Sequence, residues 1–424
     1  MTETNEKLLN YIYSDFKRTI RDPLWTDIKL TDGFYELYLS PQVQQLNRIK
    51  QLGPTYLTYP GAVHTRLVHS LGVYHLSRMI LISLLQKDTE GFTFSGINSF
   101  LIAALLHDIG HFPYAHSLKE IISESHESLG ARIIEKDCLI KSYIEGIGAN
   151  VKNVCQIIDK SRRTENKEIQ LYRHLLSGAM DPDKLDYLSR DAFYCGVPYG
   201  IQDVSFIIDR LFIKNNKPAL KIENISSLEH LLFSKYLMYQ NVYWNKNVRS
   251  ATAMIKKAVT IALNLNVLKK EDLINLDDRQ FSNIGKFSSF KAFGLFKDVM
   301  NNQLLHMVYE MPFDVDNNFC VFFQNSDYKL KTETLIWKSL KNSFPNLKPY
   351  EIIIDIPEPI SFESNFQIID GEEIKLFNEI DPIFNISTIE NFTKALRKIR
   401  IFVPTYISSN ENEIAKFIKK IGKK

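Results

Sequence analysis

The sequence has little cysteine, no repeats and no excess of charge of either sign. Its four cysteines among 424 residues are scattered, and no two form a CxxC pair. Four scattered cysteines in a chain of this size are typical of neither a disulfide framework nor a zinc knuckle, so we expect free thiols in a reducing compartment. The absence of an internal repeat excludes a solenoid. The net charge of +3 is too close to neutral to indicate a general nucleic-acid-binding protein.

Segments that would target or anchor the chain are also lacking. The first residues, "MTETNEKLLNYIYSDFKRT", are polar and acidic, so we expect no signal peptide. No apolar run approaches the roughly 18 residues that a membrane span needs. The basic end, "KFIKKIGKK", is expected to be a solvated helix end. The sequence therefore predicts a soluble, cytoplasmic protein with no membrane partner.

Helical periodicity dominates residues 1–310, where "RLVHSLGVYHLSRMILISLLQ" keeps an apolar stripe from Leu67 to Leu85. We also expect helices in "SPQVQQLNRIKQLG" and, as one long helix, in residues 227–265, and a short strand in "TDIKLT". From residue 313 onward, "NNFCVFFQ", "YEIIIDIP", "NFQIID" and "IRIFVP" are β-rich runs between helical pieces. The prediction is a mainly α protein with a smaller α+β C-terminal domain. Its parts are an N-terminal segment (1–50), a helical domain (51–312) and an α+β domain (313–424) with a structural or oligomeric role.

Histidine is concentrated around "LIAALLHDIGHFPYAHS", residues 101–117. Seven of the ten histidines lie between residues 64 and 126: His64, His69, His75, His107, His111, His116 and His126. A single histidine in an apolar helix is usually a core residue, but Asp108 in the same apolar segment needs a partner, because burying an unpaired ion costs several kcal/mol. A divalent cation is the natural partner, with His69 and a later acid completing the site, and imidazole with carboxylate suits Fe, Mn, Zn or Ni.

A second informative stretch, "GAMDPDKLDYLSRDAFYCGVPYG", spans residues 178–200. Asp183, Lys184, Tyr187 and Asp191 can lie along one flank of a helix there. Such a mixture is also typical of a solvated helix face, although neighbouring leucines give this helix an apolar side. A cation beside a tyrosine and acids would suit a phosphorylated sugar.

The ordered set of these motifs resembles the HD-domain metal-dependent phosphohydrolases. It is most similar to their deoxynucleoside triphosphate triphosphohydrolases, which include dGTPase-like bacterial dNTPases and the vertebrate SAM-and-HD-domain dNTPase. The resemblance covers residues 20–260 and rests on "RIKQLGPTYLTYPGAVHTRLVHSLGVYHL", "LLHDIGHFPYAHS", "HESLG" and "DPDKLDYLSRD". It implies hydrolysis of a dNTP to a deoxynucleoside and inorganic triphosphate.

The resemblance also implies roles for individual residues. The implied metal ligands are His69, His107, Asp108 and Asp183, and the implied catalytic residues are His116, supported by His111, His126 and Glu127. The implied substrate-binding residues are Gln51 and Leu52 at the deoxyribose, Arg66 and Lys184 at the triphosphate, Tyr187 and Asp191 at the sugar and its 3′-hydroxyl, Tyr243 near the sugar, and Lys235 and Lys246 near the phosphates.

Several points stay open at this stage. The metal can be Mn, Fe, Mg, Co, Ni or Zn. The resemblance implies a homo-oligomer, a dimer or tetramer. Gln44 is kept, but Leu39 and Asn47 replace an acid and an arginine of the nucleotide-regulated relatives, so a nucleotide activator is left undecided, and we expect no SAM domain in the short N-terminal segment.

Alternative functions are an HD-type nucleotidase or phosphodiesterase on mono- or cyclic nucleotides, and a catalytically silent nucleotide sensor. Nucleic-acid binding through "KYLMYQNVYWNKNVR" is a further alternative, but a helix packed on the pocket explains that stretch equally well.

Overall fold

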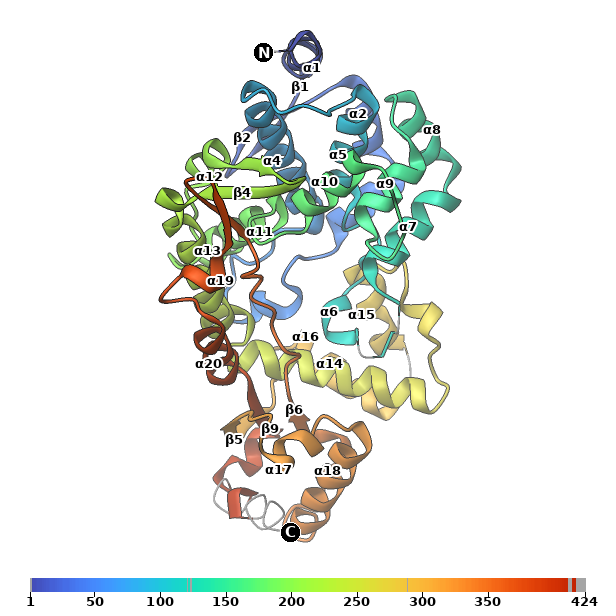
Figure 1. The fold of residues 1–424 in the computed structure, drawn as a ribbon. Coiled ribbons are helices and arrows are strands. Elements are labelled where there is room, and N and C mark those ends of the chain that lie inside the picture. Colours follow the sequence, from blue (N-terminus) through green and yellow to red (C-terminus); the bar gives the residue numbers. More distant parts are fainter. Residues whose placement is uncertain (1, 120, 123, 288, 411–413, 417–424) are drawn as a thin grey trace.

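Two apolar helices lie in the upper part of the computed structural model, which describes residues 2–119, 121–122, 124–287, 289–410 and 414–416 (Figure 1). They are α4 (Arg66–Gln86) and α5 (Phe94–Leu106), which pack against each other. Every residue of α5 from Gly96 to Leu106 is buried. A helix that is apolar all round is stable only when other elements surround it.

By length and composition, α4 would be able to cross a membrane, which differs from our expectation that no apolar run approaches that length. However, 83% of its apolar window is buried inside the protein. The helix also carries the buried polar side chains of Arg66 and His69. These features are those of a central core helix.

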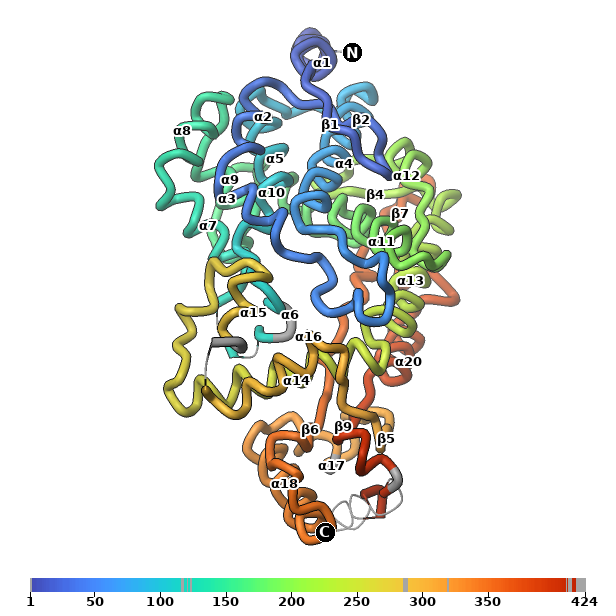
Figure 2. The backbone as a smooth tube through the Cα atoms, turned by 180° about the vertical axis from the view of Figure 1, so that it is seen from behind, coloured from blue at the N-terminus to red at the C-terminus, as the bar shows by residue number. Residues whose placement is uncertain are grey.

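Shorter helices pack around this pair and extend the body downward to α14 (Figures 1 and 2). The other α-helices are α1 (Glu3–Ser14), α2 (Asp32–Leu39), α3 (Pro41–Gln45), α6 (Ala115–Leu118), α7 (His126–Lys136), α8 (Cys138–Gly146), α9 (Val151–Ile158), α10 (Lys167–Leu176), α11 (Pro182–Cys195), α12 (Val204–Arg210), α13 (Ser226–Met238), α14 (Lys246–Asn264), α15 (Asp278–Phe287), α16 (Gly294–Met300), α17 (Asn318–Phe322), α18 (Ser326–Leu340), α19 (Phe377–Ile380) and α20 (Ile386–Leu396). Short helical turns are η1 (Leu46–Arg48), η2 (Gly53–Leu57), η3 (Ile222–Asn224), η4 (Tyr239–Tyr243), η5 (Lys270–Leu273), η6 (Lys291–Phe293), η7 (Pro349–Glu351) and η8 (Thr405–Asn410).

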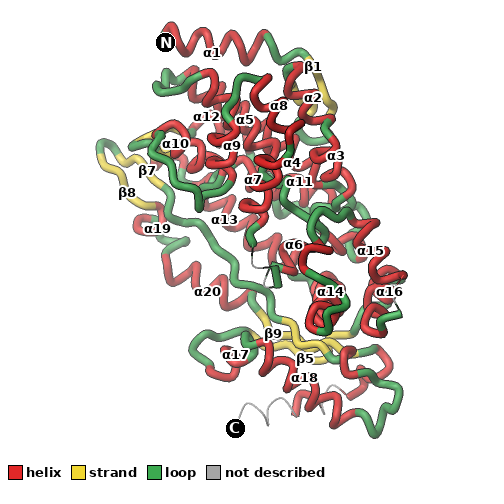
Figure 3. The backbone as a smooth tube through the Cα atoms, turned by 90° about the vertical axis from the view of Figure 1, so that its right-hand side faces the viewer, coloured by secondary structure: helices red, strands yellow, loops and turns green. Residues whose placement is uncertain are grey.

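Within the described residues, the strands form three small sheets (Figure 3). They are the hairpin of β1 (Arg18–Asp22) and β2 (Thr26–Leu30); a mixed sheet in the order β3 (Phe212–Lys214), β4 (Lys217–Lys221), β7 (Gln367–Asp370), β8 (Glu373–Leu376); and an antiparallel sheet in the order β5 (His306–Pro312), β9 (Lys398–Val403), β6 (Ile353–Asp355). Because β4 pairs in parallel with β7, residues on both sides of the boundary predicted at 313 share a sheet.

Residues 356–366, which we call the strap, run without regular secondary structure from β6 in the lower part of the molecule to β7 beside the helical body (Figures 1 and 3). Phe362 and Phe366 are buried in the main hydrophobic core. Arg397 Nε donates to the Pro357 carbonyl at 2.8 Å. The strap is therefore attached at several points along its length.

The mainly α class with a smaller α+β part is confirmed, and "TDIKLT" contains β2. The prediction of one long helix over residues 227–265 is wrong. The π-helical turn η4 follows α13, and α14 starts anew after Asn245, whose backbone is extended (φ −51°, ψ 138°) and whose side chain accepts the Asn247 N–H. The Trp244 carbonyl accepts instead from Arg400 in β9, at 2.8 Å.

Two further local predictions also differ from the structure. "NNFCVFFQ" contains the helix α17, because the Asn317 carbonyl accepts from the N–H groups of Cys320 and Val321. The helix expected in residues 40–53 stops early, with α3 and η1 ending at Arg48. The chain is then extended, and Lys50 forms a β-bridge with Thr65 at the start of α4.

Candidate active site

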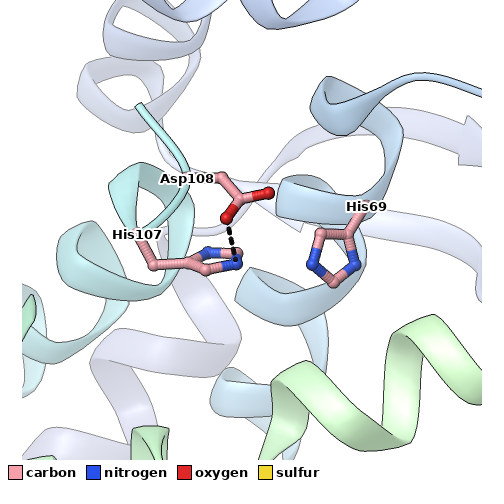
Figure 4. A group of neighbouring side chains, drawn as sticks. All are labelled: His69, His107 and Asp108. Carbon is pink, nitrogen blue, oxygen red and sulfur yellow. Dashed lines mark ion pairs between the residues drawn. The ribbon is translucent and has the colours of Figure 1, made fainter. Parts of the chain in front are cut away.

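Three of the predicted metal ligands meet where α4 begins and α5 ends (Figure 4). His69 lies one turn into α4, and His107 and Asp108 directly follow α5. Ligand atoms of all three lie within 4.8 Å of one another. The two imidazole rings are arranged edge to face, with their centroids 5.2 Å apart. The packing of α4 on α5 thus brings together residues that are distant in the sequence.

The fourth predicted ligand, Asp183, comes from the first turn of α11. Its Oδ1 lies 3.0 Å from His69 Nε2 and 3.8 Å from His107 Nε2. The helix begins at this point because the Asp181 side chain accepts the backbone N–H of Lys184 and a proline follows the cap. The "DPDK" stretch therefore encodes the helix start that presents Asp183 to both histidines.

Hydrogen bonds on the far side of both imidazoles leave their Nε2 atoms facing the cluster. His107 Nδ1 lies 2.8 Å from the Ala104 carbonyl, which can only accept, so Nδ1 carries the proton. His69 Nδ1 lies 2.8 Å from Asp186 Oδ2. His107 Nε2 is buried and makes no hydrogen bond among the described residues. Imidazole nitrogens oriented in this way beside carboxylates fit a divalent cation.

The carboxylates strongly favour a positive charge at this point. Burial lowers the pKa of His69, but hydrogen bonds with Asp183 and Asp186 outweigh it and raise the pKa to about 10. Burial raises the pKa of Asp183, but its hydrogen bond with His69 lowers the pKa to about 2. The arrangement therefore needs one positive charge, which a proton on His69 or a bound cation can supply.

Behind His69, a buried ionic network holds the imidazole in place. Asp186 accepts from Arg190, at 2.9 Å from both Nε and Nη2, and from the indole Nε1 of Trp25 at 2.5 Å. Arg190 Nη1 also donates to Asp22 at 2.9 Å. Burial raises the pKa of Asp186, but Arg190 and His69 hold it below its usual range. The β1–β2 hairpin, which supplies Asp22 and Trp25, thus supports the site from the rear.

The network fits because Gly72 lets α4 and α11 approach closely. A Cβ atom at Gly72 would lie 1.8 Å from Asp186 Oδ1 and 2.6 Å from Arg190 Nη2. No side chain can be accommodated at such distances, and neither neighbour can move without breaking its own hydrogen bonds. Glycine at this position is therefore a requirement of the ionic network.

Two of the predicted catalytic residues, His111 and His126, also lie close to Asp108. Arg66 Nη1 donates to Asp108 Oδ2 at 2.6 Å, and His111 Nε2 lies 3.2 Å from Asp108 Oδ1. The His111 ring stacks on His126 with centroids 4.0 Å apart, and His126 Nε2 lies 3.3 Å from Glu127 Oε1.

Burial, with Arg66 nearby, holds the pKa of His111 well below its usual range, and burial also lowers the pKa of His126. Both imidazoles are therefore neutral at neutral pH. His116 lies in α6, but its side chain is outside the described part of the structure, so its predicted role stays a prediction.

A cavity of about 600 Å³ opens beside the ligand cluster. All but one of the predicted substrate-binding residues line it: Gln51, Leu52, Arg66, Lys184, Tyr187, Asp191, Lys235 and Tyr243. Lys246 was predicted to lie near the phosphates, but it does not belong to the lining of this cavity. It is exposed at the first turn of α14, and that helix presents Val248, Arg249 and Thr252 to the cavity instead.

Three tyrosines form one wall of the cavity. Tyr187 comes from α11, and the π-helical turn η4 supplies Tyr239 and Tyr243, whose rings lie 5.0 Å apart. The hydroxyl of Tyr243 donates to Asp191 Oδ2 at 2.7 Å, and the buried His64 lies 2.8 Å from Asp191 Oδ1. Asp191 is thereby held at the cavity surface by partners on two sides.

The sequence interpretation missed residues that come from other parts of the chain. Tyr239 was indicated only by its spacing of four residues from Tyr243. Ser361 and Glu363 of the strap also line the cavity, although no chemistry was predicted for the C-terminal region. Nothing in the local sequence of the strap indicates this position, because it depends on the packing of distant elements.

Comparisons with known proteins agree with this arrangement. The HD domain family matches residues 66–191, which contain all four predicted ligands, and the family described as HD associated region matches residues 202–421. An uncharacterised Methanocaldococcus jannaschii protein, MJ1154, is 31% identical over 96% of this chain and 84% of its own length.

The deoxynucleoside triphosphate triphosphohydrolase SAMHD1 of Danio rerio is 30% identical, over 59% of this chain and 46% of its own length. The chain thus matches less than half of that protein. A crystal structure of a hypothetical protein from Aquifex aeolicus superposes with a TM-score of 0.73 at 25% identity and covers 94% of this chain and 99% of that one.

Proposed function

The chain belongs to the HD-domain phosphohydrolases with an HD-associated region, and on this premise we propose that it hydrolyses deoxynucleoside triphosphates to a deoxynucleoside and inorganic triphosphate. The observation that carries the proposal is the composition of a single cavity. The ligand cluster lines one side, and two buried lysines with three tyrosines line the other. The similarity to SAMHD1 supports the same substrate class.

The chain's own residues supply the charge that a triphosphate requires. Arg66, Lys184 and Lys235 are buried cations in the cavity lining. Cations fixed in a site from which water is largely excluded stabilise developing negative charge more than they would in water. A divalent cation held by His69, His107, Asp108 and Asp183 would supply Lewis-acid activation and lower the pKa of a water molecule.

The sugar end of the substrate would lie against the tyrosine wall. Asp191, held by His64 and Tyr243, presents a carboxylate that can accept a hydrogen bond from a 3′-hydroxyl. Leu52 and Tyr187 line the same cavity and would pack against the deoxyribose. His116 remains our predicted proton donor to the 5′-oxygen that leaves.

The test is a turnover assay with purified protein and Mn²⁺ or Mg²⁺, with each of the four dNTPs offered alone and then mixed. Chromatography should resolve a deoxynucleoside and inorganic triphosphate. The variant Asp108→Ala should abolish both products. Formation of dNDP with phosphate, or of dNMP with pyrophosphate, would overturn the proposal.

The same assay addresses the finer parts of the proposal. Activity only in the dNTP mixture would reveal a nucleotide activator, and comparison of the four substrates would show whether the enzyme is dGTPase-like. Metal analysis of the purified protein identifies the cation. Mass measurement in solution tests the homo-oligomer, and a reducing, cytoplasmic location agrees with the four free cysteines.

A further inference from the structure

The strap places an acidic side chain in the cavity, above two buried lysines. Glu363 Oε2 lies 3.0 Å from Lys235 Nζ and 3.8 Å from Lys184 Nζ. The Glu363 side chain is 40% exposed, whereas the side chains of Lys235 and Lys184 are 5% and 11% exposed. The carboxylate therefore approaches both ammonium groups from the open side of the cavity.

The other contacts of Lys184 lie at the start of α11 and in the loop before it, and the other contact of Lys235 is a neutral backbone carbonyl of the strap. Lys184 Nζ donates to the Gly178 carbonyl at 2.9 Å and to Asp181 Oδ2 at 2.7 Å. Lys235 Nζ donates to the Ser361 carbonyl at 2.6 Å. An ammonium group has three N–H donors. Glu363 is thus the carboxylate that forms an ion pair with both lysines at the cavity.

Glu363 is a partly exposed side chain on a firmly attached stretch of backbone. Phe362, the preceding residue, is buried, and its ring lies 5.7 Å from Lys235 Nζ. Phe366, which follows closely, is also buried. A rotation about the side-chain bonds of Glu363 would release both lysines without moving the strap.

We propose that Glu363 is a specificity-determining residue, because its carboxylate lies between Lys184 and Lys235 where a substrate phosphate must bind. A ligand that reaches this point has to displace it. A terminal phosphate carries close to two negative charges and three acceptor oxygens, so a polyphosphate replaces the carboxylate, whereas a weakly charged anion does not. The inference rests on the proposed function only in assigning both lysines to the phosphate end of the substrate.

Calorimetric titration of the full chain, loaded with metal, with inorganic tripolyphosphate tests the proposal. Glu363→Gln keeps the size of the side chain and can still accept a hydrogen bond from Lys235, so the cavity should keep its shape. We expect it to bind tripolyphosphate about tenfold more tightly than the unchanged protein, since no like charge has to be displaced. Equal or weaker binding, or no binding by either protein, would overturn the proposal.

Two further variants separate local displacement from a general effect of charge. Glu358→Gln removes an acid from the same strap and the same cavity lining, where the described residues show no ion pair with a lysine. It should change the affinity less than twofold, as expected for a partly exposed charge without an ion-pair partner among the described residues. In the double variant Glu363→Gln with Lys235→Met, the gain in tripolyphosphate affinity should disappear. If the double variant keeps this gain, Glu363 does not act at Lys235 and the proposal is contradicted.

Turnover of dNTPs is measured on the same preparations. Tighter tripolyphosphate binding without dNTP hydrolysis would keep the role of Glu363 and reject the proposed function. Hydrolysis of dNTPs, together with an unchanged tripolyphosphate affinity in Glu363→Gln, would support the proposed function and reject the role of Glu363.

Discussion

The two sides of the cavity are built in different ways. On the metal side, His107 and Asp108 are adjacent, and His69 and Asp183 each lie in the first turns of a helix within the HD domain. On the opposite side, Lys235 and Glu363 come from α13 and the strap, which are far apart in the chain. The first side is encoded by short motifs at helix ends, and the second is assembled only when the HD-associated region folds back onto the helical body.

The largest expected effect comes from removing one of the predicted metal ligands. His107→Ala should lower turnover about a thousandfold, because the site loses one of its two imidazole ligands. Elemental analysis should show loss of bound metal. The control is His230→Ala, an exposed histidine of α13. Full metal content in His107→Ala would contradict the assignment of the metal side.

The next effect tests how tightly the metal side is packed. Gly72→Ala should lower the free energy of unfolding by about 3 kcal/mol, because the new Cβ atom collides with Asp186 and Arg190. Urea unfolding measures the loss. The matched control, Gly146→Ala at the end of α8, meets no atom within 4 Å and should change stability by less than about 1 kcal/mol. Equal stability of both variants would refute the packing argument.

The charge of the metal side should be visible as a pH dependence. The pKa of His69 is about 10 in the folded chain, against 6.5 as the ordinary value. A raised pKa stabilises the protein fully below pH 6.5, and this contribution is lost as the pH rises toward 10. In EDTA, we expect the free energy of unfolding to fall by on the order of 2 to 3 kcal/mol between pH 7 and pH 10. His69→Gln should lack this part of the decline, and an identical pH profile for the variant would disprove the linkage.

A change on the tyrosine wall should leave the metal side intact. Tyr243→Phe removes the hydroxyl that donates to Asp191. We expect KM for a dNTP to rise about tenfold, as for loss of one hydrogen bond to a charged group, with unchanged metal content. Tyr239→Phe, whose hydroxyl has no hydrogen bond to the described residues, should raise KM less. A loss of metal in Tyr243→Phe would show that the two sides are not independent.

The smallest effect concerns the support behind His69. Trp25→Phe deletes the N–H donor to Asp186 and should cost about 1 kcal/mol of stability, with a modest loss of metal affinity. Trp337→Phe in α18 deletes a comparable N–H donor, which bonds to the Leu347 carbonyl. It should lower the stability by a similar amount without affecting metal binding. Unfolding curves and metal titrations of both variants provide the comparison.

Sequence reasoning selected residues that the structure brings together in the candidate ligand cluster, and it did so for a physical reason. Periodicity identified α4 and α5, and the concentration of histidines around Asp108 in an apolar segment favoured a cation site over ordinary core residues. It failed at η4 and at α17, where short apolar runs do not distinguish a helix from a strand or a break. The family resemblance, and not the periodicity, implied a place for Lys246 near the phosphates, and this exposed residue lies outside the cavity lining.

The sequence by itself determined the types of ligand, the helix starts that present them, and the mainly α class, since each depends on neighbours within one or two turns. The tertiary structure decided which distant residues join the candidate ligand cluster in lining the cavity and in supporting it. The ion pair of Glu363 with Lys235, the hydrogen bond of Trp25 to Asp186 and the close approach at Gly72 all join residues that no local rule connects. Such contacts exist only because burial of the apolar faces brings distant segments together, and that packing is a property of the whole chain.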